Sequence, residues 1–386
     1  MRQSKSDKNR PESTTPPTLT KDEIAAFSSD LLAWYRASGR SLPWRDRKDD
    51  PYAVWISEIM LQQTTVNAVV SFYNRWMLRF PTVTSLADAT LDDVLKHWAG
   101  LGYYARARNL KKAAEQVSSH FEGRLPQSVE ELMRLPGIGR YTAGAISSIA
   151  FGCDSPTVDA NIIRVICRLF ALHGDPKSSS TLTKRLWEIA ELLLPSGHAG
   201  EFNQSLMELG ALICLPASPR CESCPVSTYC KARTTGDPAQ FPEFGEAKKW
   251  IDVAHAACFV QHDGRLLIVQ RPLEQLWGGL WELPRTSAFT DEDLGQTAVR
   301  AVRETVGILV TEPAAAGFVK HVVTNRKVSL YGFDAEWDGA GDPAPIACRQ
   351  LAWVKPDELD KFAISSPQLE LLAQWREAKK HPTLKV

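Results

Sequence analysis

The sequence lacks any run of 18 apolar residues, a secretory signal and a lipidation motif. These absences favour a protein that stays inside the cell, in the cytoplasm or nucleoid if the source is bacterial and in the nucleus if it is eukaryotic. Thiols remain reduced in such compartments. The eight cysteines are therefore expected to be free or bound to a metal rather than joined in disulfides.

An excess of charge of either sign is also missing. Lys plus Arg and Asp plus Glu number 45 each, so the net charge says nothing about a nucleic-acid partner. Acidic residues are absent from one local stretch, 94–114, which holds Lys96, Arg106, Arg108, Lys111 and Lys112. A basic run of this kind is most often a solvated helix face, so alone it is a weak sign of DNA binding.

Convincing strand patterns are absent from the first 233 residues, which instead show one helical pattern after another. We expect residues 1–20, polar and proline-containing, to be a disordered lead-in, and 21–233 to be an all-helical region. Within it, one long helix is predicted from Val54 to about Leu78.

The composition and the hydrophobic pattern of the sequence change after Arg233. Residues 234–252 are rich in Pro, Gly and charge and are predicted to be a linker. Residues 253–370 are predicted to form a smaller α+β domain, and 371–386 a charged, frayed tail. The segments expected in that domain are strands at 254–260, 266–270, 327–333 and 351–354 and a helix at 296–306.

A glycine-rich turn at Leu135–Gly144 is the most distinctive motif of the helical region. Pro136 ends one helix, and Gly137 and Gly139 permit positive φ and close backbone approach before the next helix begins. Unpaired N–H groups at such a helix start suit an anion such as a phosphate. An ordinary helix–helix turn has the same pattern, so the motif needs support from its neighbours.

Four cysteines follow the last of these helices with the spacing C-x6-C-x2-C-x5-C: Cys214, Cys221, Cys224 and Cys230. Four thiolates in so short a loop could hold zinc or an iron–sulfur cluster. Spacing alone does not separate the two.

Two carboxylates stand out for chemistry. Glu58 lies in an apolar helical stretch, on the same predicted face as Gln62 and Thr65, so its pKa should be raised and it could act as an acid near neutral pH. The alternative is a structural ion pair with an arginine such as Arg45. Asp159 reads as a helix N-cap whose donors would keep it ionised, although N-capping alone would explain it.

A pair of carboxyl groups, one with a raised pKa and one with a lowered pKa, is the arrangement that glycosidic bond cleavage uses. The adjacent phosphate-binding turn suggests that the sugar belongs to a nucleic acid.

With these motifs in place the chain resembles the MutY-type adenine DNA glycosylases of the helix-hairpin-helix superfamily, which also contains endonuclease III. The resemblance spans about 22–233, and a weaker one to the family's Nudix-like domain covers roughly 250–370. The motifs that carry it are Glu58–Thr64, Gly100–Arg106, Leu135–Gly144, Val158–Asn161 and the four cysteines.

The resemblance implies a six-helix barrel and an iron–sulfur helical domain, with the lesion site between them and a [4Fe–4S] cluster on the four cysteines. It implies excision of adenine opposite 8-oxoguanine or guanine in double-stranded DNA, by a monomer and without a membrane. Glu58 would protonate N7 of the extruded adenine and Asp159 would stabilise the oxocarbenium ion, by transient covalent capture or by charge, with Tyr141 and Asn161 in support.

The resemblance also implies DNA contacts. Gln63 and Tyr103 would insert into the duplex, with Leu61 and Thr64 alongside, and Gly137 and Gly139 would face phosphates. Endonuclease III-like enzymes carry a lysine at the position of Tyr141. Tyrosine forms no Schiff base, so a monofunctional glycosylase is expected.

The C-terminal domain departs from the Nudix pattern. The pair of glutamates that would bind Mg²⁺ is missing after Arg303–Glu304, so diphosphate hydrolysis is not expected. Where the family commonly has Phe-Ser-His to probe 8-oxoguanine, this chain has Val323, Thr324 and Asn325, of which Thr324 keeps a hydroxyl.

Three alternatives remain open from the sequence. One is a glycosylase for another mispaired base, such as thymine opposite guanine. The others are a non-catalytic iron–sulfur protein that binds DNA and a nucleotide diphosphatase.

Overall fold

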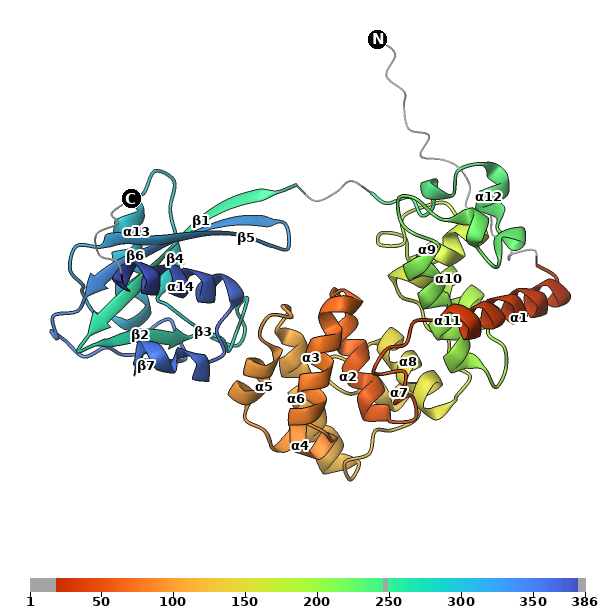
Figure 1. The fold of residues 1–386 in the computed structure, drawn as a ribbon, viewed down its shortest axis with the longest axis horizontal. Coiled ribbons are helices and arrows are strands. Elements are labelled where there is room, and N and C mark those ends of the chain that lie inside the picture. Colours follow the sequence, from red (N-terminus) through yellow and green to blue (C-terminus); the bar gives the residue numbers. More distant parts are fainter. Residues whose placement is uncertain (1–18, 246–248, 381–386) are drawn as a thin grey trace, which may run out of the picture. The chain divides into compact units, whose positions relative to one another are not determined.

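A computed structural model describes residues 19–245 and 249–380 of the chain (Figure 1). The chain divides into two compact units. The first is built from the segments up to Gln62 and from Leu125 to Glu246, and the second from 63–124 and from Ala247 onward. Nearly all of the predicted lead-in, 1–20, lies outside the described residues. Thr20 is described, and its side chain caps the first helix in a reciprocal capping box with Glu23.

The first unit is helical and is assembled from two distant stretches of chain. Ser28 on α1 donates a hydrogen bond to the carbonyl of Leu193, 165 residues later, and Arg36 pairs with Glu201 at 2.6 Å. Its apolar core joins α1, α9, α10 and α11. The elements are α1 (Lys21–Ser38), α2 (Pro51–Leu61), α7 (Val129–Leu132), α8 (Arg140–Phe151), α9 (Ala160–Leu169), α10 (Ser180–Leu193), α11 (Ala199–Leu212), η1 (Cys221–Ser223), η2 (Ser227–Tyr229), α12 (Lys231–Thr235) and η3 (Pro238–Gln240).

The predicted single helix over 54–78 is wrong, because the chain forms two helices there. α2 ends at Leu61 and α3 (Val66–Arg79) begins after a break in which Gln63 has a φ of 59°. Gln62 is the C-cap of α2 and Thr65 the N-cap of α3. The sequence predicts that these two residues share a helix face with Glu58. That prediction is wrong, because the helix ends at Leu61, before either of them.

The helical part of the second unit comprises α3, α4 (Val83–Asp88), α5 (Leu91–Trp98) and α6 (Ala105–His120). Aromatic side chains fill its interior, with Trp76 packed edge-to-face against Phe80 and Trp98. Arg106 and Lys111 are buried and donate to backbone carbonyls. The basic run at 94–114 is therefore only partly a solvated face.

The rest of the second unit is a mixed sheet between two helices (Figure 1). Strand β1 alternates its side chains, sending Ala257 and Phe259 to the face covered by α14 and Cys258 and Val260 to the face covered by α13. β1 pairs in parallel with β6, and β6 with β5 in antiparallel. The elements are β1 (Ile251–His262), β2 (Arg265–Gln270), β3 (Trp281–Glu282), β4 (Arg285–Ser287), α13 (Leu294–Val306), β5 (Ala314–Val323), β6 (Arg326–Glu336), β7 (Gln350–Val354), η4 (Pro356–Lys361) and α14 (Ser366–Lys380).

Two predicted boundaries need correction. Residues 371–380 are not a frayed tail but the end of α14, where buried Trp375 stacks on Phe259 with ring centroids 5.1 Å apart. The predicted linker is also structured at its start, because Phe241 is buried in the core of the first unit and its carbonyl accepts from Arg168. Among the described residues, no helix is both long and apolar enough to cross a membrane.

Candidate active site

Glu58 lies near the end of α2, a helix whose residues are almost all buried. Only 5% of Glu58 is exposed. Burial strips water from the carboxyl group and raises the pKa of Glu58 to about 7. The apolar neighbours seen in the sequence therefore have the expected effect, and the group can both hold and release a proton near neutral pH.

The glycine-rich turn presents Tyr141 to this carboxyl group. Gly137 has a φ of 79°, and Gly139 is the N-cap of α8, so Tyr141 falls in the first turn of that helix. Its hydroxyl donates to Oε2 of Glu58 at 2.5 Å and also lies 3.7 Å from the sulfur of Met207 on α11. Burial, with Glu58 and Asp159 nearby, holds the pKa of Tyr141 well above its usual range, so the phenol remains a donor.

The structural ion pair considered for Glu58 is not formed. Arg45 instead donates to Oε2 of Glu208 at 2.8 Å, and Arg40 binds the same carboxylate through two nitrogens. Glu208 is 1% exposed, and despite its burial these hydrogen bonds lower its pKa to about 2. Glu208 is thus ionised near neutral pH, and Arg45 pairs with it rather than with Glu58.

Asp159 is the N-cap of α9, as the sequence predicts. Its Oδ1 accepts from the backbone N–H of Ile162 at 2.7 Å, and its Oδ2 accepts from the side-chain amide of Asn161 at 2.9 Å. The expected direction of its pKa is wrong, however. Desolvation outweighs these donors and the charge of Arg164, so the pKa of Asp159 is raised rather than lowered.

Arg164, which the sequence gave no reason to single out, supports this carboxylate indirectly. Its Nη2 donates to Oδ1 of Asn161 at 2.9 Å and to the carbonyl of Gly210 at 2.7 Å, while its Nε donates to the carbonyl of Cys214 at 2.7 Å. A chain of hydrogen bonds therefore runs from the first cysteine of the loop to Asp159.

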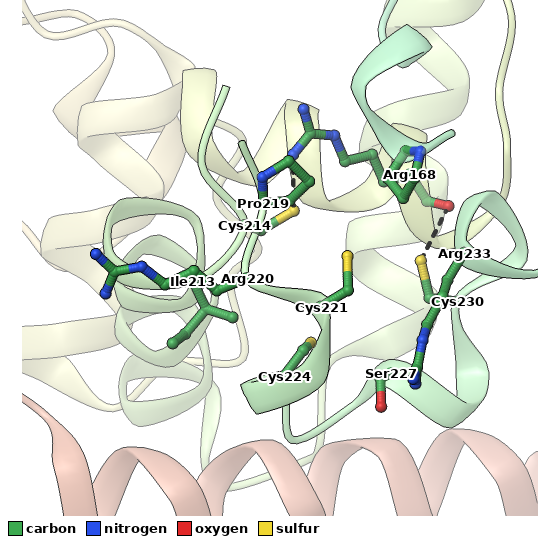
Figure 2. A pocket seen from close by; sticks show the side chains of 11 residues that line it. Arg168, Ile213, Cys214, Pro219, Arg220, Cys221, Cys224, Ser227, Cys230 and Arg233 are labelled. Atoms are coloured by element: carbon green, nitrogen blue, oxygen red, sulfur yellow. Dashed lines mark hydrogen bonds between the residues drawn. The ribbon is translucent and has the colours of Figure 1, made fainter. Parts of the chain in front are cut away.

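The four cysteines line one pocket below α9 (Figure 2). Arg168 reaches into the same pocket, with Nη1 3.4 Å from Sγ of Cys214, and binds the carbonyls of Leu215 and Pro216 at 2.6 Å each. In the part of the chain that the structure describes, no group of three or more His, Cys, Asp or Glu side chains is arranged to hold a metal ion. The four thiols thus line one pocket together with Arg168.

Comparison with known proteins shows which family the chain belongs to. Residues 56–191 match the family model for the HhH-GPD superfamily of base excision DNA repair proteins, and 255–374 match the NUDIX domain. The chain is 36% identical over 401 residues to the adenine DNA glycosylase of Homo sapiens, covering 89% of this chain and 73% of that protein. The chain belongs to the adenine DNA glycosylase family.

Two further comparisons extend this finding. The adenine DNA glycosylase of Buchnera aphidicola subsp. Baizongia pistaciae is 44% identical over 207 residues, which are 53% of this chain and 58% of that protein. The solved structure of a thermostable thymine-DNA glycosylase is 33% identical with a TM-score of 0.51, covering 55% of this chain and 98% of that one. The matches to the HhH-GPD and NUDIX family models confirm the predicted helical region with a Nudix-like α+β domain.

In this member of the adenine DNA glycosylase family, the residues predicted to enter the duplex lie in two turns. Gln63 and Tyr103 both have positive φ, 59° and 47°, and Tyr103 is 52% exposed. Buried Arg106 joins the turns: it donates to Oγ1 of Thr64 at 3.3 Å and lies 5.5 Å from the Tyr103 ring. Leu61, half-buried, ends α2 in the other unit.

Thr324 occupies the turn between β5 and β6. It is exposed, with a φ of 54°, and its hydroxyl donates to the carbonyl of Val323 at 2.7 Å. In the Nudix-like domain Glu282 pairs with Arg271 and Arg285. Glu282 and Glu304 line one cavity of this domain, and Glu304 pairs with Arg300 at 3.2 Å.

Proposed function

We propose that this protein is an adenine DNA glycosylase that excises adenine paired with 8-oxoguanine or guanine. The observation that carries the proposal is the buried carboxyl group of Glu58, with a pKa of about 7 and a hydrogen bond from Tyr141. A carboxyl group in this state can protonate a base near neutral pH, and the names of the relatives support adenine as that base.

In the proposed reaction, Glu58 donates its proton to N7 of an adenine turned out of the duplex. Protonation makes the base a better leaving group, and the glycosidic bond breaks to leave an oxocarbenium ion. Asp159, held by Ile162 and Asn161, then stabilises that cation, by its charge or by transient bonding at C1′. The negative charge of Asp159 also helps to raise the pKa of Glu58.

Water completes the reaction, and no strand cleavage follows. The residue in the first turn of α8, just after the glycine-rich turn, is Tyr141, which has no amine to form a Schiff base with the opened sugar. The product is therefore an abasic site.

We infer that the four cysteines hold a [4Fe–4S] cluster. The donor set is four thiols around one pocket with a cationic Arg168 beside Cys214. Four thiolates that line one pocket are a donor set that suits such a cluster, and the resemblance to the family favours the cluster over zinc. The bound cluster would supply four iron–sulfur bonds that fasten the segment 221–230 to Cys214, just after the end of α11.

DNA contacts are assigned to four turns. Gln63 and Tyr103 project from positive-φ turns held by Arg106 and would fill the space left by the extruded base, with Leu61 and Thr64 beside them. The exposed backbone of Gly137 and Gly139 would face phosphates. Thr324 would probe the base opposite the adenine.

A single-turnover assay tests the proposal. Duplexes with adenine opposite 8-oxoguanine or guanine are mixed with excess enzyme, and released adenine and strand nicks are measured separately. The wild type should release adenine without nicking, and Glu58→Gln should bind the same duplexes but release none. Binding without release by the wild type would instead indicate a non-catalytic DNA-binding protein.

A thymine glycosylase is the second candidate, because the chain is 33% identical to a solved thymine-DNA glycosylase. The same assay with thymine opposite guanine separates the two. Faster release of thymine than of adenine would replace the first proposal with this one.

A further inference from the structure

The end of the sheet that carries Thr324 combines exposed apolar groups with positive charge. Three large apolar side chains are unusually exposed there: Trp250 at 54%, Ile251 at 49% and Val322 at 60%. Trp250 and Val322 lie on the face that carries Lys327, whereas Ile251 lies beside Arg326 on the opposite face, because side chains alternate along a strand. Figure 1 shows the ends of β1 and β5 projecting beyond α14 at this point.

Strand pairing fixes these residues next to the turn. Ile251 lies opposite Arg326 in the β1–β6 pair, and Val322 lies opposite Lys327 in the β5–β6 pair. The backbone N–H of Ile251 donates to the carbonyl of Asn325 at 2.9 Å, and the Asn325 side chain donates to the carbonyl of Lys249 at 3.0 Å. Trp250 sits between these two anchors, so its backbone is held against the 324–325 turn.

The charges around Trp250 are mostly of one sign. The two segments that form this end of the sheet, 249–255 and 318–328, contain four Lys and Arg residues and a single acidic residue, Asp252. The Nζ of Lys327 lies 5.7 Å above the Trp250 ring. The basic residues are Lys249, Lys320, Arg326 and Lys327, all exposed.

We propose that Trp250 is a stacking platform for a base in the DNA strand opposite the adenine, with Lys327 on a flanking phosphate. An exposed aromatic ring among cations has the chemistry of sites that hold unstacked bases. Where the resemblance implies an aromatic residue, this chain has Val323, the last residue of β5. Trp250, which directly precedes β1, supplies an aromatic face beside the β5–β6 turn. This inference rests on the proposed function.

Binding of duplex DNA by the full-length protein tests the inference, in the Glu58→Gln background so that no base is lost. Trp250→Ala should weaken binding about tenfold, and Trp250→Phe by no more than about threefold, because phenylalanine keeps a ring face. Stacking reads no exocyclic group, so duplexes with 8-oxoguanine and with guanine should lose affinity equally. Phe289→Ala is the matched control: this ring is 67% exposed with Arg300 above it, and its removal should change nothing.

The phosphate contact has its own signature. Lys327→Ala should lower the slope of log affinity against log salt by about one charge. A Trp250→Ala protein that binds as tightly as its parent would overturn the inference, and so would an equal loss in Trp250→Phe. Unchanged DNA binding with an altered sedimentation coefficient would overturn it too and assign this surface to a protein contact. Failure of the wild type to release adenine is a separate result, which refutes the proposed function itself.

Discussion

Glu58 and Tyr141 each shift the pKa of the other. Burial favours the neutral form of Glu58, whereas the hydroxyl of Tyr141 donates to its carboxylate and works in the opposite direction. The pKa of about 7 is mainly the balance of these two effects, with a further rise from the charge of Asp159 and a lowering from that of Arg45. Asp159 shows the same competition, with desolvation against the N–H of Ile162 and the amide of Asn161.

Removing the phenol should therefore move the pH profile in a known direction. In Tyr141→Phe the carboxylate of Glu58 loses a donor, so its pKa rises, and the protonated, active form persists to higher pH. Single-turnover rates against pH should show the alkaline limb, near pH 7 in the wild type, displaced upward. An alkaline limb that stays in place would mean that Glu58 is not the acid.

Asp159 allows its structural and chemical roles to be separated. Asn caps helices as well as Asp does, so Asp159→Asn should keep the bond from Ile162 and unfold at nearly the wild-type denaturant concentration. It should nevertheless lose about 10²-fold or more in adenine release, because the negative charge is gone. Asp159→Ala should lose the activity and also about 1 kcal/mol of stability. Activity retained by the Asn variant would leave Asp159 as a cap only.

The sequence predicted single residues well where the cause was local. The apolar neighbours of Glu58 and the cap position of Asp159 could be read directly. The pairing of Arg45 with Glu208, 163 residues away, could not, because nothing local marks the partner. The pKa direction of Asp159 was missed for the same reason, since its burial depends on chain that folds over it.

At the scale of elements, α9 and α11 approach so closely that only glycine fits at one point. A Cβ at Gly210 would lie 2.6 Å from the Cβ of Asn161. The closeness lets Arg164 bind the carbonyl of Gly210 and the amide of Asn161 with the same nitrogen. The position of Asn161, and through it that of Asp159, is thus set by how two helices pack.

Gly210→Ala should force these helices apart. We expect a loss of about 1–3 kcal/mol in the free energy of unfolding, typical of overpacking, and slower adenine release with little change in DNA affinity. Ala211→Ser, at the half-buried neighbouring position, is the control and should leave both unchanged. An active, stable Gly210→Ala protein would show that the helix contact does not position Asn161.

Helices were easier to predict than their breaks. Asp159 marked a helix start because its capping chemistry is local, whereas Thr20, which caps α1, was assigned to the lead-in. The break between α2 and α3 was missed because Gln63 adopts positive φ with neither glycine nor proline to announce it. β5 was missed because it begins with the small residues of 314–317, which carry no alternating pattern, and α14 because its polar exposed face dominates its composition.

For the molecule as a whole, Glu58, the proposed catalytic acid, also lowers the stability of the folded protein. The pKa of Glu58 is about 7 in the folded protein, against an ordinary value of 4.5. Between these values the folded state holds a proton that the unfolded state has released. Stability should therefore fall as pH rises from about 4.5 to 7.

Glu58→Gln removes this penalty. The variant should be more stable than the wild type at pH 8, by up to about 3 kcal/mol at 1.36 kcal/mol per pKa unit, and similar to it at pH 4.5. Denaturant unfolding at the two pH values measures the difference. Equal stability of the two proteins at pH 8 would mean that the charged carboxylate is well solvated in the folded state.

The partnership of α1 with α11 has a consequence for how a cell makes this protein. Arg36 finds Glu201 only after 165 further residues have been joined to the chain. At the usual 5–20 residues per second, that is a wait of roughly 8–33 s at the ribosome. Throughout this interval the apolar stripe of the first helix is without its native cover, so nascent α1 is where a holding chaperone would be expected to bind.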